Sequence, residues 1–301
     1  ANEDAARELY EKARPDWIIF GNGFSSLSKI NQHSHTALML HGIGPKACYY
    51  EVSESDIQYR FIEGKHRLSR LVETFPDKKF IDTGYAKLDP IVNGTQQKID
   101  LEAIGLKPDK PTILYAPTFY PSSIEKLPTD FPKKLEAFNL IIKPHYFSLT
   151  KSRYKKQQIM FQNWMKHANV YLASAEEISI LPFMGVADIL ISDTSSTLFE
   201  FTALNKPAIW CDFFKVRWSY RGIFKWRLKK RLDQDIAYFG KVATRVTNLQ
   251  ELLTQVVIHV NEPSLKEQDR LEMRELLTGE VDGLCSERIA DFIVDESKIQ
   301  K

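Results

Sequence analysis

The stretch ADILISDTSSTLFEF, residues 187–201, joins an apolar run to a helical pattern through consecutive polar residues. The run before the polar residues is typical of a strand buried on both faces, and the run after them has helical spacing. The N-terminus of a helix has unpaired N–H groups, so hydroxyl side chains there suit a phosphate. One residue would be enough to cap the helix, but this stretch supplies five candidates in a row, so we predict a phosphate site. The five residues are Ser192, Asp193, Thr194, Ser195 and Ser196.

The same pattern, a predicted strand followed directly by a predicted helix, recurs along the chain and predicts the fold. Short apolar runs that alternate with helical patterns indicate parallel βαβ units. Residues 92–110 lack periodicity and separate two such series, which predicts two Rossmann-like α/β domains. We place them at residues 1–104 and 105–301. The first series includes DWIIFGNG (16–23), HTALMLHGIG (35–44) and FIDTG (80–84), and the second includes PTILYAPT (111–118), NLIIKPH (139–145) and PAIWCD (207–212).

Composition limits the function classes. The 301 residues are enough for about two domains, and a formal net charge of +2 gives no global field for nucleic acid. The three cysteines are widely spaced, so neither a disulfide framework nor a zinc site is expected, and a reducing cytoplasm is the simpler interpretation. No apolar run approaches the roughly 20 residues of a membrane span, and no signal peptide is expected.

Two histidines follow predicted strands, where ligands of parallel sheets bind. His41 precedes two glycines that permit close approach, and a neutral imidazole can accept a proton from a hydroxyl. Lys143 and His145 flank a proline that keeps the backbone extended, so both side chains project together as a positive clamp for a diphosphate. Thr118 ends another strand and is a further candidate ligand. For each histidine, a purely structural or exposed role is the alternative.

Three other features are more ambiguous. Glu200, one turn into the helix, is placed either on the ribose hydroxyls of a nucleotide or in solvent. The pair His33 and His35 lacks a completing ligand, so no metal site is expected. Residues 215–232 carry eight basic residues, four interleaved aromatics and no acid. This segment suits an anionic membrane surface or a polyanionic acceptor, and a solvated basic loop is the alternative.

Six motifs in order resemble the CDP-glycerol glycerophosphotransferases that build teichoic acids and related capsular polymers. Each motif alone is weak, but the six together cover roughly residues 35–293. They are HGIGPK (41–46), DTGYAKLD (82–89), ILYAPTF (113–119), IIKPH (141–145), ADILISDTSSTLFEFTALNKPAIWCD (187–212) and GEVDGLCSERIADFI (279–293).

The resemblance implies a GT-B fold, in which two Rossmann-like domains face a cleft and the C-terminal one holds the nucleotide. It implies transfer of glycerol phosphate from a CDP-glycerol donor to a hydroxyl, with release of CMP. By position, His41 matches the proposed base, His145 the second essential histidine, and Ser195 and Ser196 the phosphate-binding pair. The scheme requires no metal or other cofactor.

The sequence departs from the family pattern in places. Thr194 replaces a tyrosine, and Ala86 and Lys87 replace a Pro-Arg pair. These departures concern the identity of the donor. The alternatives to glycerol phosphate as the transferred group are ribitol phosphate and a sugar phosphate. The N-terminal acceptor domain is also short, which leaves open whether its first strands are missing.

The sequence leaves several alternatives for function and partners. A GT-B nucleotide-sugar glycosyltransferase, a UDP-sugar 2-epimerase and a non-catalytic nucleotide- or polymer-binding module are the rival functions. The expected partners are a CDP-polyol donor and a polyol phosphate, glycan or lipid-linked acceptor, with peripheral contact to an anionic membrane and no nucleic acid. We therefore expect a cytoplasmic location at the inner face of the membrane.

Overall fold

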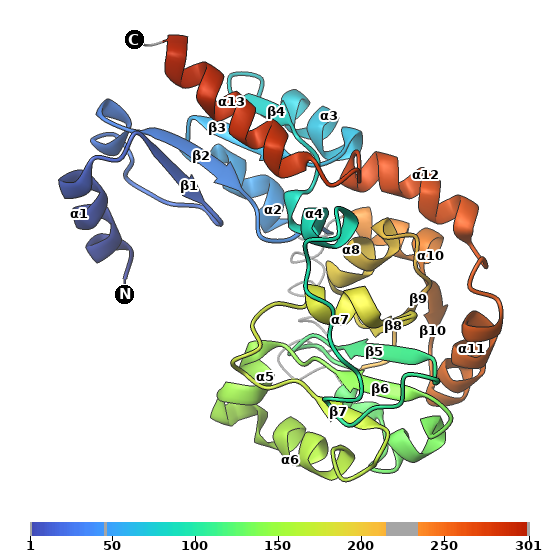
Figure 1. The fold of residues 1–301 in the computed structure, drawn as a ribbon. Coiled ribbons are helices and arrows are strands. Elements are labelled where there is room, and N and C mark those ends of the chain that lie inside the picture. Colours follow the sequence, from blue (N-terminus) through green and yellow to red (C-terminus); the bar gives the residue numbers. More distant parts are fainter. Residues whose placement is uncertain (1, 45–46, 215–233, 300–301) are drawn as a thin grey trace, which may run out of the picture.

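Two parallel β-sheets form the two lobes of the molecule (Figure 1). The computed structural model describes residues 2–44, 47–214 and 234–299. The first sheet has the order β1-β2-β3-β4 and the second has the order β10-β9-β8-β5-β6-β7. The strands of the first sheet are β1 (Trp17–Phe20), β2 (His35–Met39), β3 (Tyr59–Ile62) and β4 (Lys79–Asp82). Those of the second are β5 (Thr112–Ala116), β6 (Asn139–Ile142), β7 (Val170–Leu172), β8 (Ile189–Ser192), β9 (Ala208–Cys211) and β10 (Thr244–Val246).

The second sheet has the doubly wound Rossmann order. Read outward from β5, the chain first adds β6 and β7 on one side and then β8, β9 and β10 on the other. The order therefore reverses between β5 and β8, and the crevice at such a switch point is where open α/β sheets bind ligands. The loops that follow β5 and β8 contain Thr118 and Asp193, so both predicted site residues lie at this switch point.

Helices cover both sheets and fill the connections between strands (Figure 1). The α-helices of the first half are α1 (Glu3–Ala13), α2 (Cys48–Glu51), α3 (Lys65–Thr74), α4 (Asp89–Val92), α5 (Tyr146–Thr150) and α6 (Lys155–Trp164). Those of the second half are α7 (Leu181–Val186), α8 (Thr197–Ala203), α10 (Phe239–Val242), α11 (Leu249–Asn261), α12 (Glu267–Thr278) and α13 (Cys285–Ile299). The 3₁₀ turns include η3 (Ala86–Leu88), η5 (Phe131–Leu135) and η9 (Gln234–Tyr238). The basic segment 215–232 lies outside the described residues.

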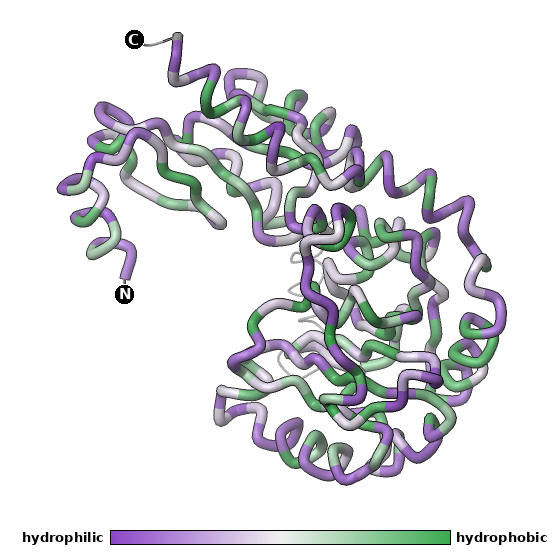
Figure 2. Tube along the Cα trace, viewed as in Figure 1, coloured by the Kyte–Doolittle hydropathy of each residue, from purple (hydrophilic) through white to green (hydrophobic). Residues whose placement is uncertain are grey.

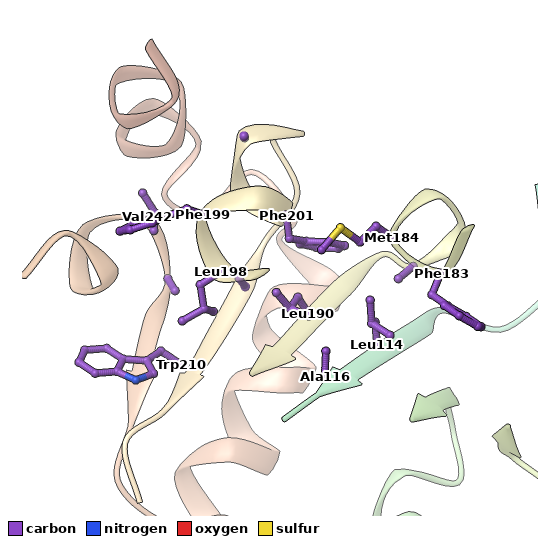
Figure 3. Close-up of a cluster of buried hydrophobic side chains, with 14 of the residues drawn as sticks. Leu114, Ala116, Phe183, Met184, Leu190, Leu198, Phe199, Phe201, Trp210 and Val242 are labelled. Carbon is purple, nitrogen blue, oxygen red and sulfur yellow. The ribbon is translucent and has the colours of Figure 1, made fainter. Parts of the chain in front are cut away.

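The core of the second lobe has two apolar layers, one on each face of the sheet. Alternate residues of a strand point to opposite faces. Leu114 and Leu190 accordingly pack with α7, α8 and α10, and Figure 3 shows this cluster. Ile113 and Ile189 pack on the other face with α6 and α11. Figure 2 shows the resulting apolar strands as green segments within polar connections. Burial on both faces explains why these strands read as continuous apolar runs.

The last helix returns to the first lobe (Figure 1). Trp17 Nε1 donates a hydrogen bond of 2.8 Å to Ser297 Oγ, and the Tyr59 hydroxyl donates one of 2.6 Å to Glu296 Oε1. The Phe292 ring lies 5.7 Å from that of Phe61. The predicted division assigned residues 105–301 to the second domain. It is corrected at α13, which packs on the first sheet and belongs to the N-terminal lobe. A single boundary along the sequence cannot show that the last helix returns to the first lobe. Where α13 packs depends on which apolar face of the first sheet is left uncovered.

We expect Phe292→Ala to lower the free energy of unfolding by about 2 kcal/mol, less than the 3–5 kcal/mol typical of a fully buried phenylalanine. Phe292 is half-buried against three aromatic rings of the first sheet, those of Trp17, Tyr59 and Phe61. Val294→Ala is the matched control, because Val294 is 50% exposed on the same helix. The measurement is urea unfolding of both variants. Equal effects would contradict the placement of α13 on the first sheet.

Candidate active site

His41 lies just past β2, and one hydrogen bond fixes which of its nitrogens is a base. Its Nδ1 lies 3.1 Å from the carbonyl oxygen of Gly21, the residue after β1. A carbonyl only accepts, so Nδ1 carries the proton and donates it. In the neutral ring, Nε2 then has the lone pair. The side chain is exposed, so an acceptor hydroxyl can reach that lone pair.

His145 has the opposite arrangement at the end of β6. Its Nδ1 accepts the backbone N–H of Phe147 at 3.1 Å, as the N-cap of α5. The proton of the neutral ring is therefore on Nε2, which makes that nitrogen a donor. Lys143, two residues earlier, is half-buried, and burial lowers the pKa of its ammonium. The two imidazoles therefore have different chemical abilities: His41 can take a proton and His145 can donate a hydrogen bond.

Asp193 ties together the two loops at the switch point. Its carboxylate is fully buried and accepts hydrogen bonds from Thr118 N at 3.0 Å, Ser122 Oγ at 3.0 Å and Ser123 N at 3.1 Å. Burial raises the pKa of Asp193 to about 6, and the donors from Ser123, Ser122 and Thr118 oppose that rise. The prediction that Asp193 contacts the nucleotide is corrected, because a side chain with no exposed surface holds the loop instead.

Thr118 is held in the same way, while three hydroxyls after β8 stay accessible. Thr118 Oγ1 donates to the carbonyl of Pro121 at 2.6 Å, which commits that hydrogen internally. Thr194, Ser195 and Ser196 are partly exposed, and Ser195 Oγ accepts the Thr197 N–H at 3.3 Å. Because α8 is only seven residues long, the hydroxyl groups matter more here than the helix dipole.

The loop after β2 presses against the start of α8 and brings the two lobes together. A methyl group at Gly42 would lie 2.8 Å from the Tyr49 hydroxyl and 3.3 Å from Ser196 Oγ. Gly44 has φ +138°, and a methyl group there would lie 3.3 Å from the Ser196 Cα. Only glycine allows both this backbone shape and this approach. His41 of the first lobe is thereby held beside the hydroxyl cluster of the second.

Glu200 does not face a nucleotide cleft. Its side chain is fully buried, and Oε2 lies 2.7 Å from Lys87 Nζ of the other lobe. The hydroxyl of Tyr85 lies 3.1 Å from Oε1. The predicted ribose contact of Glu200 is therefore corrected. Both of its carboxylate oxygens already have partners, Tyr85 and Lys87.

A pocket of about 600 Å³ opens beside His41 at the carboxyl edge of the first sheet. Ile19 and Met39 form part of its lining and are 43% and 39% exposed. Lys87 and Glu63 line it too, so the pocket combines apolar walls with one lysine and one glutamate. Its other lining residues include Leu40, Phe61, Thr83, Tyr85, Ser286 and Ile289.

A chain of side-chain contacts links the predicted residues along one edge. The His145 ring lies 4.6 Å from the Phe119 ring, and the neighbouring Thr118 binds Asp193. Three residues after Asp193, Ser196 lies against the glycine loop that follows His41. No contact joins Lys143 to the hydroxyl cluster in the described part of the chain. No group of three or more metal-ligating side chains occurs among the described residues, and the expectation that no metal is needed stays a prediction.

Sequence reasoning missed the residues that support this edge. Ser122 and Ser123 bind Asp193, and their only signal is the polar pair after Pro121. Tyr85 and Lys87 lie in the motif DTGYAKLD (82–89), yet their contacts with Glu200 join residues more than a hundred positions apart.

The family model for CDP-glycerol:poly(glycerophosphate) glycerophosphotransferase matches residues 32–295. The chain belongs to this family. Within the family, the teichoic acid glycerol-phosphate primase of Bacillus subtilis is 27% identical over 148 residues, which are 49% of this chain and 37% of the primase. The primase of Bacillus spizizenii is 26% identical over 155 residues, or 50% of this chain and 39% of that protein. The chain thus spans well under half the length of these relatives.

Solved structures confirm the predicted GT-B fold of this family member. The wall teichoic acid polymerase TagF, in crystals soaked with CDPG, has a TM-score of 0.61 at 16% identity, covering 95% of this chain and 73% of TagF. UDP-GlcNAc 2-epimerase from Neisseria meningitidis has a TM-score of 0.60 at 15% identity, with 97% and 80% covered. Since both share the fold, the fold does not distinguish the two chemistries, whereas family membership favours glycerophosphotransfer.

We expect Asp193→Asn to destabilise the protein by about 1–3 kcal/mol, the cost of leaving buried donors unpaired. The amide places an N–H₂ group against the donors from residues 118 to 123, so two donors face each other. Ser122→Ala removes one donor only and is expected to cost about 1 kcal/mol. Thermal unfolding of both variants measures this. A neutral Asp193→Asn variant would show that the carboxylate does not hold the loop.

Proposed function

We propose that this chain transfers glycerol phosphate from CDP-glycerol to an acceptor hydroxyl and releases CMP. Family membership supports the reaction class, and the similarity to teichoic acid glycerol-phosphate primases supports a role in making a glycerol phosphate polymer of the cell wall. The observation that carries the proposal is the fixed Nδ1 proton of His41, which leaves Nε2 as a base where the two lobes meet.

The first step is acceptor activation by His41. The acceptor occupies the pocket beside the imidazole, and its hydroxyl proton passes to Nε2 as the oxygen attacks the phosphorus that carries glycerol. The bond from that phosphorus to the bridging oxygen breaks, and its electron pair stays on the departing CMP phosphate. The products are a phosphodiester and CMP, and the imidazolium returns its proton to solvent.

The second requirement is neutralisation of charge on the leaving phosphate. We assign this to Lys143, the Nε2–H of His145 and the hydroxyls of Thr194, Ser195 and Ser196. Fixed donors aimed at developing charge contribute about 3 kcal/mol each to catalysis. Thr118 then acts by shaping the loop between these groups.

The donor test is nucleotide release, as CMP from CDP-glycerol or CDP-ribitol and as UDP from UDP-GlcNAc, in the presence of a short poly(glycerol phosphate) primer. Product analysis separates the rival functions, because a phosphodiester, a glycosidic bond and an epimerised sugar have different masses or spectra. We expect CMP and an extended primer with CDP-glycerol. CMP binding without CMP release would instead indicate a binding module.

The location proposed for the chain is the cytoplasmic face of the membrane, in peripheral contact. No helix among the described residues has the length and apolarity to span a bilayer. The support is the sequence of residues 215–232, with eight basic residues and no acid. Sedimentation with vesicles of anionic lipid, against vesicles of neutral lipid, tests this contact.

We expect His41→Gln to lower kcat by about 10²–10⁴-fold while the Kd of CMP changes little, because an amide cannot act as a base. The role of His145 as a hydrogen-bond donor is tested by comparing His145→Gln with His145→Asn. A glutamine amide N–H reaches the place of Nε2, whereas asparagine reaches only that of Nδ1, so His145→Gln should retain more activity than His145→Asn. CMP release and CMP titration measure both. Full activity in His41→Gln would refute the assignment of the base.

We expect CMP release to continue unchanged in EDTA, because side chains supply the positive charge in this scheme. The measurement is the initial rate before and after chelation, with Mg²⁺ added back as the control. A rate that collapses in EDTA and returns with Mg²⁺ would show that a divalent ion shares the neutralisation.

A further inference from the structure

A buried ion pair joins the two lobes directly behind the His41 loop. Lys87 belongs to η3, after the last strand of the first sheet, and Glu200 belongs to α8 of the second lobe. Their charged atoms lie 2.7 Å apart, and the Glu200 side chain has no exposed surface while that of Lys87 is 33% exposed. Burying a carboxylate is costly unless a partner and hydrogen bonds compensate it. The charge of Glu200 is therefore compensated by a cation that the other lobe provides.

Tyr85 connects this ion pair to the backbone of the histidine. Its hydroxyl lies 3.1 Å from Glu200 Oε1 and 3.2 Å from the carbonyl oxygen of His41. The phenol has one hydrogen, so it donates to one of these two acceptors at a time. Burial, followed by the charge of Glu200, raises the pKa of Tyr85 well above its ordinary range. Tyr85 thus stays protonated and remains a donor.

The position of Glu200 in α8 gives this cluster a geometric consequence. Glu200 N bonds to the carbonyl of Ser196, so the carboxylate lies one turn after the hydroxyl cluster. The same Ser196 contacts the glycine loop that follows His41. A rotation of either lobe would separate Lys87 from Glu200 and also move His41 away from the hydroxyls. One rigid turn therefore links the buried pair to both halves of the site.

We propose that Glu200, Lys87 and Tyr85 form an interdomain latch that holds His41 in register with the phosphate-binding hydroxyls. They are positioning residues with respect to the donor, which none of them needs to touch. Lys87 and Tyr85 also line the acceptor pocket, but in the latch they act through Glu200 and the His41 backbone. The assignment of their effect to His41 rests on the proposed function, whereas the latch itself rests on the contacts alone. A ribose contact of Glu200 is the alternative, and it requires Lys87 to release the carboxylate.

The activity test compares Lys87→Met, Glu200→Gln and Tyr85→Phe. The matched control is Lys65→Met, which removes another lysine–glutamate pair between the lobes, with Glu275, whose side chains are 69% and 68% exposed. We expect Lys87→Met and Glu200→Gln to lower kcat by about 10- to 100-fold, since small displacements of a catalytic group have effects of this size. The KM for CDP-glycerol and the Kd of CMP should stay within about twofold, because uniform binding is not lost.

Two further variants guard against simple misfolding. Lys87→Arg keeps the charge and should recover most of kcat, and thermal unfolding checks that each variant is folded. The double variant Lys87→Met with Glu200→Gln should be no slower than the slower single variant, because both changes break one interaction. Additive losses would show that the two residues act separately and would overturn the latch.

Small-angle X-ray scattering provides a readout that does not depend on turnover. Without donor, Lys87→Met and Glu200→Gln should have a larger radius of gyration than the unaltered chain, and Lys65→Met should not. If Glu200→Gln alone weakens CMP binding and Lys87→Met leaves both kcat and the radius unchanged, Glu200 is a ribose ligand and the latch is refuted. If the unaltered chain releases no CMP from any donor, the proposed function fails, and the scattering result still decides the latch.

Discussion

The contact between the His41 loop and the start of α8 is the constraint on which the rest of the structure depends. Gly42 and Gly44 let that loop lie against Ser196 with no side chain between them. Parallel sheets bind ligands at the carboxyl ends of their strands, and His41 lies at that edge of the first sheet while Ser195 and Ser196 lie at that edge of the second. Close approach of the two backbones places them together. Family relatives that share the GT-B fold face the same geometric problem of joining two edges.

Buried polar groups keep each edge in shape, and their burial explains why they are not ligands. Asp193 fixes the loop from Thr118 to Ser123, and Glu200 accepts Lys87 from the opposite lobe. The exposed groups are different ones, namely two imidazoles with opposite protonation patterns and a row of hydroxyls. The site thus separates buried residues that hold the geometry from residues that solvent and a substrate can reach.

The sequence predicted most of the fold, because strands buried on both faces are continuous apolar runs with helices between them. It failed where the signal is short or non-local. Strand β3 contains a buried Arg60 that bonds to three carbonyls, and β10 has only three residues, so neither has an apolar run. The two histidines were predicted as site residues from their place at strand ends, and the structure does place both at strand ends. The burial of Asp193 and Glu200, in contrast, depends on tertiary contacts that no spacing encodes.

The most direct measurement is a crystal structure of this chain with CMP and then with CDP-glycerol. The account predicts the CMP phosphate within hydrogen-bonding distance of His145 Nε2 and of a hydroxyl on Ser195 or Ser196. It also predicts that the glycerol-bearing phosphorus faces His41 Nε2 across the pocket of the first lobe. A nucleotide bound far from both imidazoles, with the lobes arranged as they are here, would contradict the central claim.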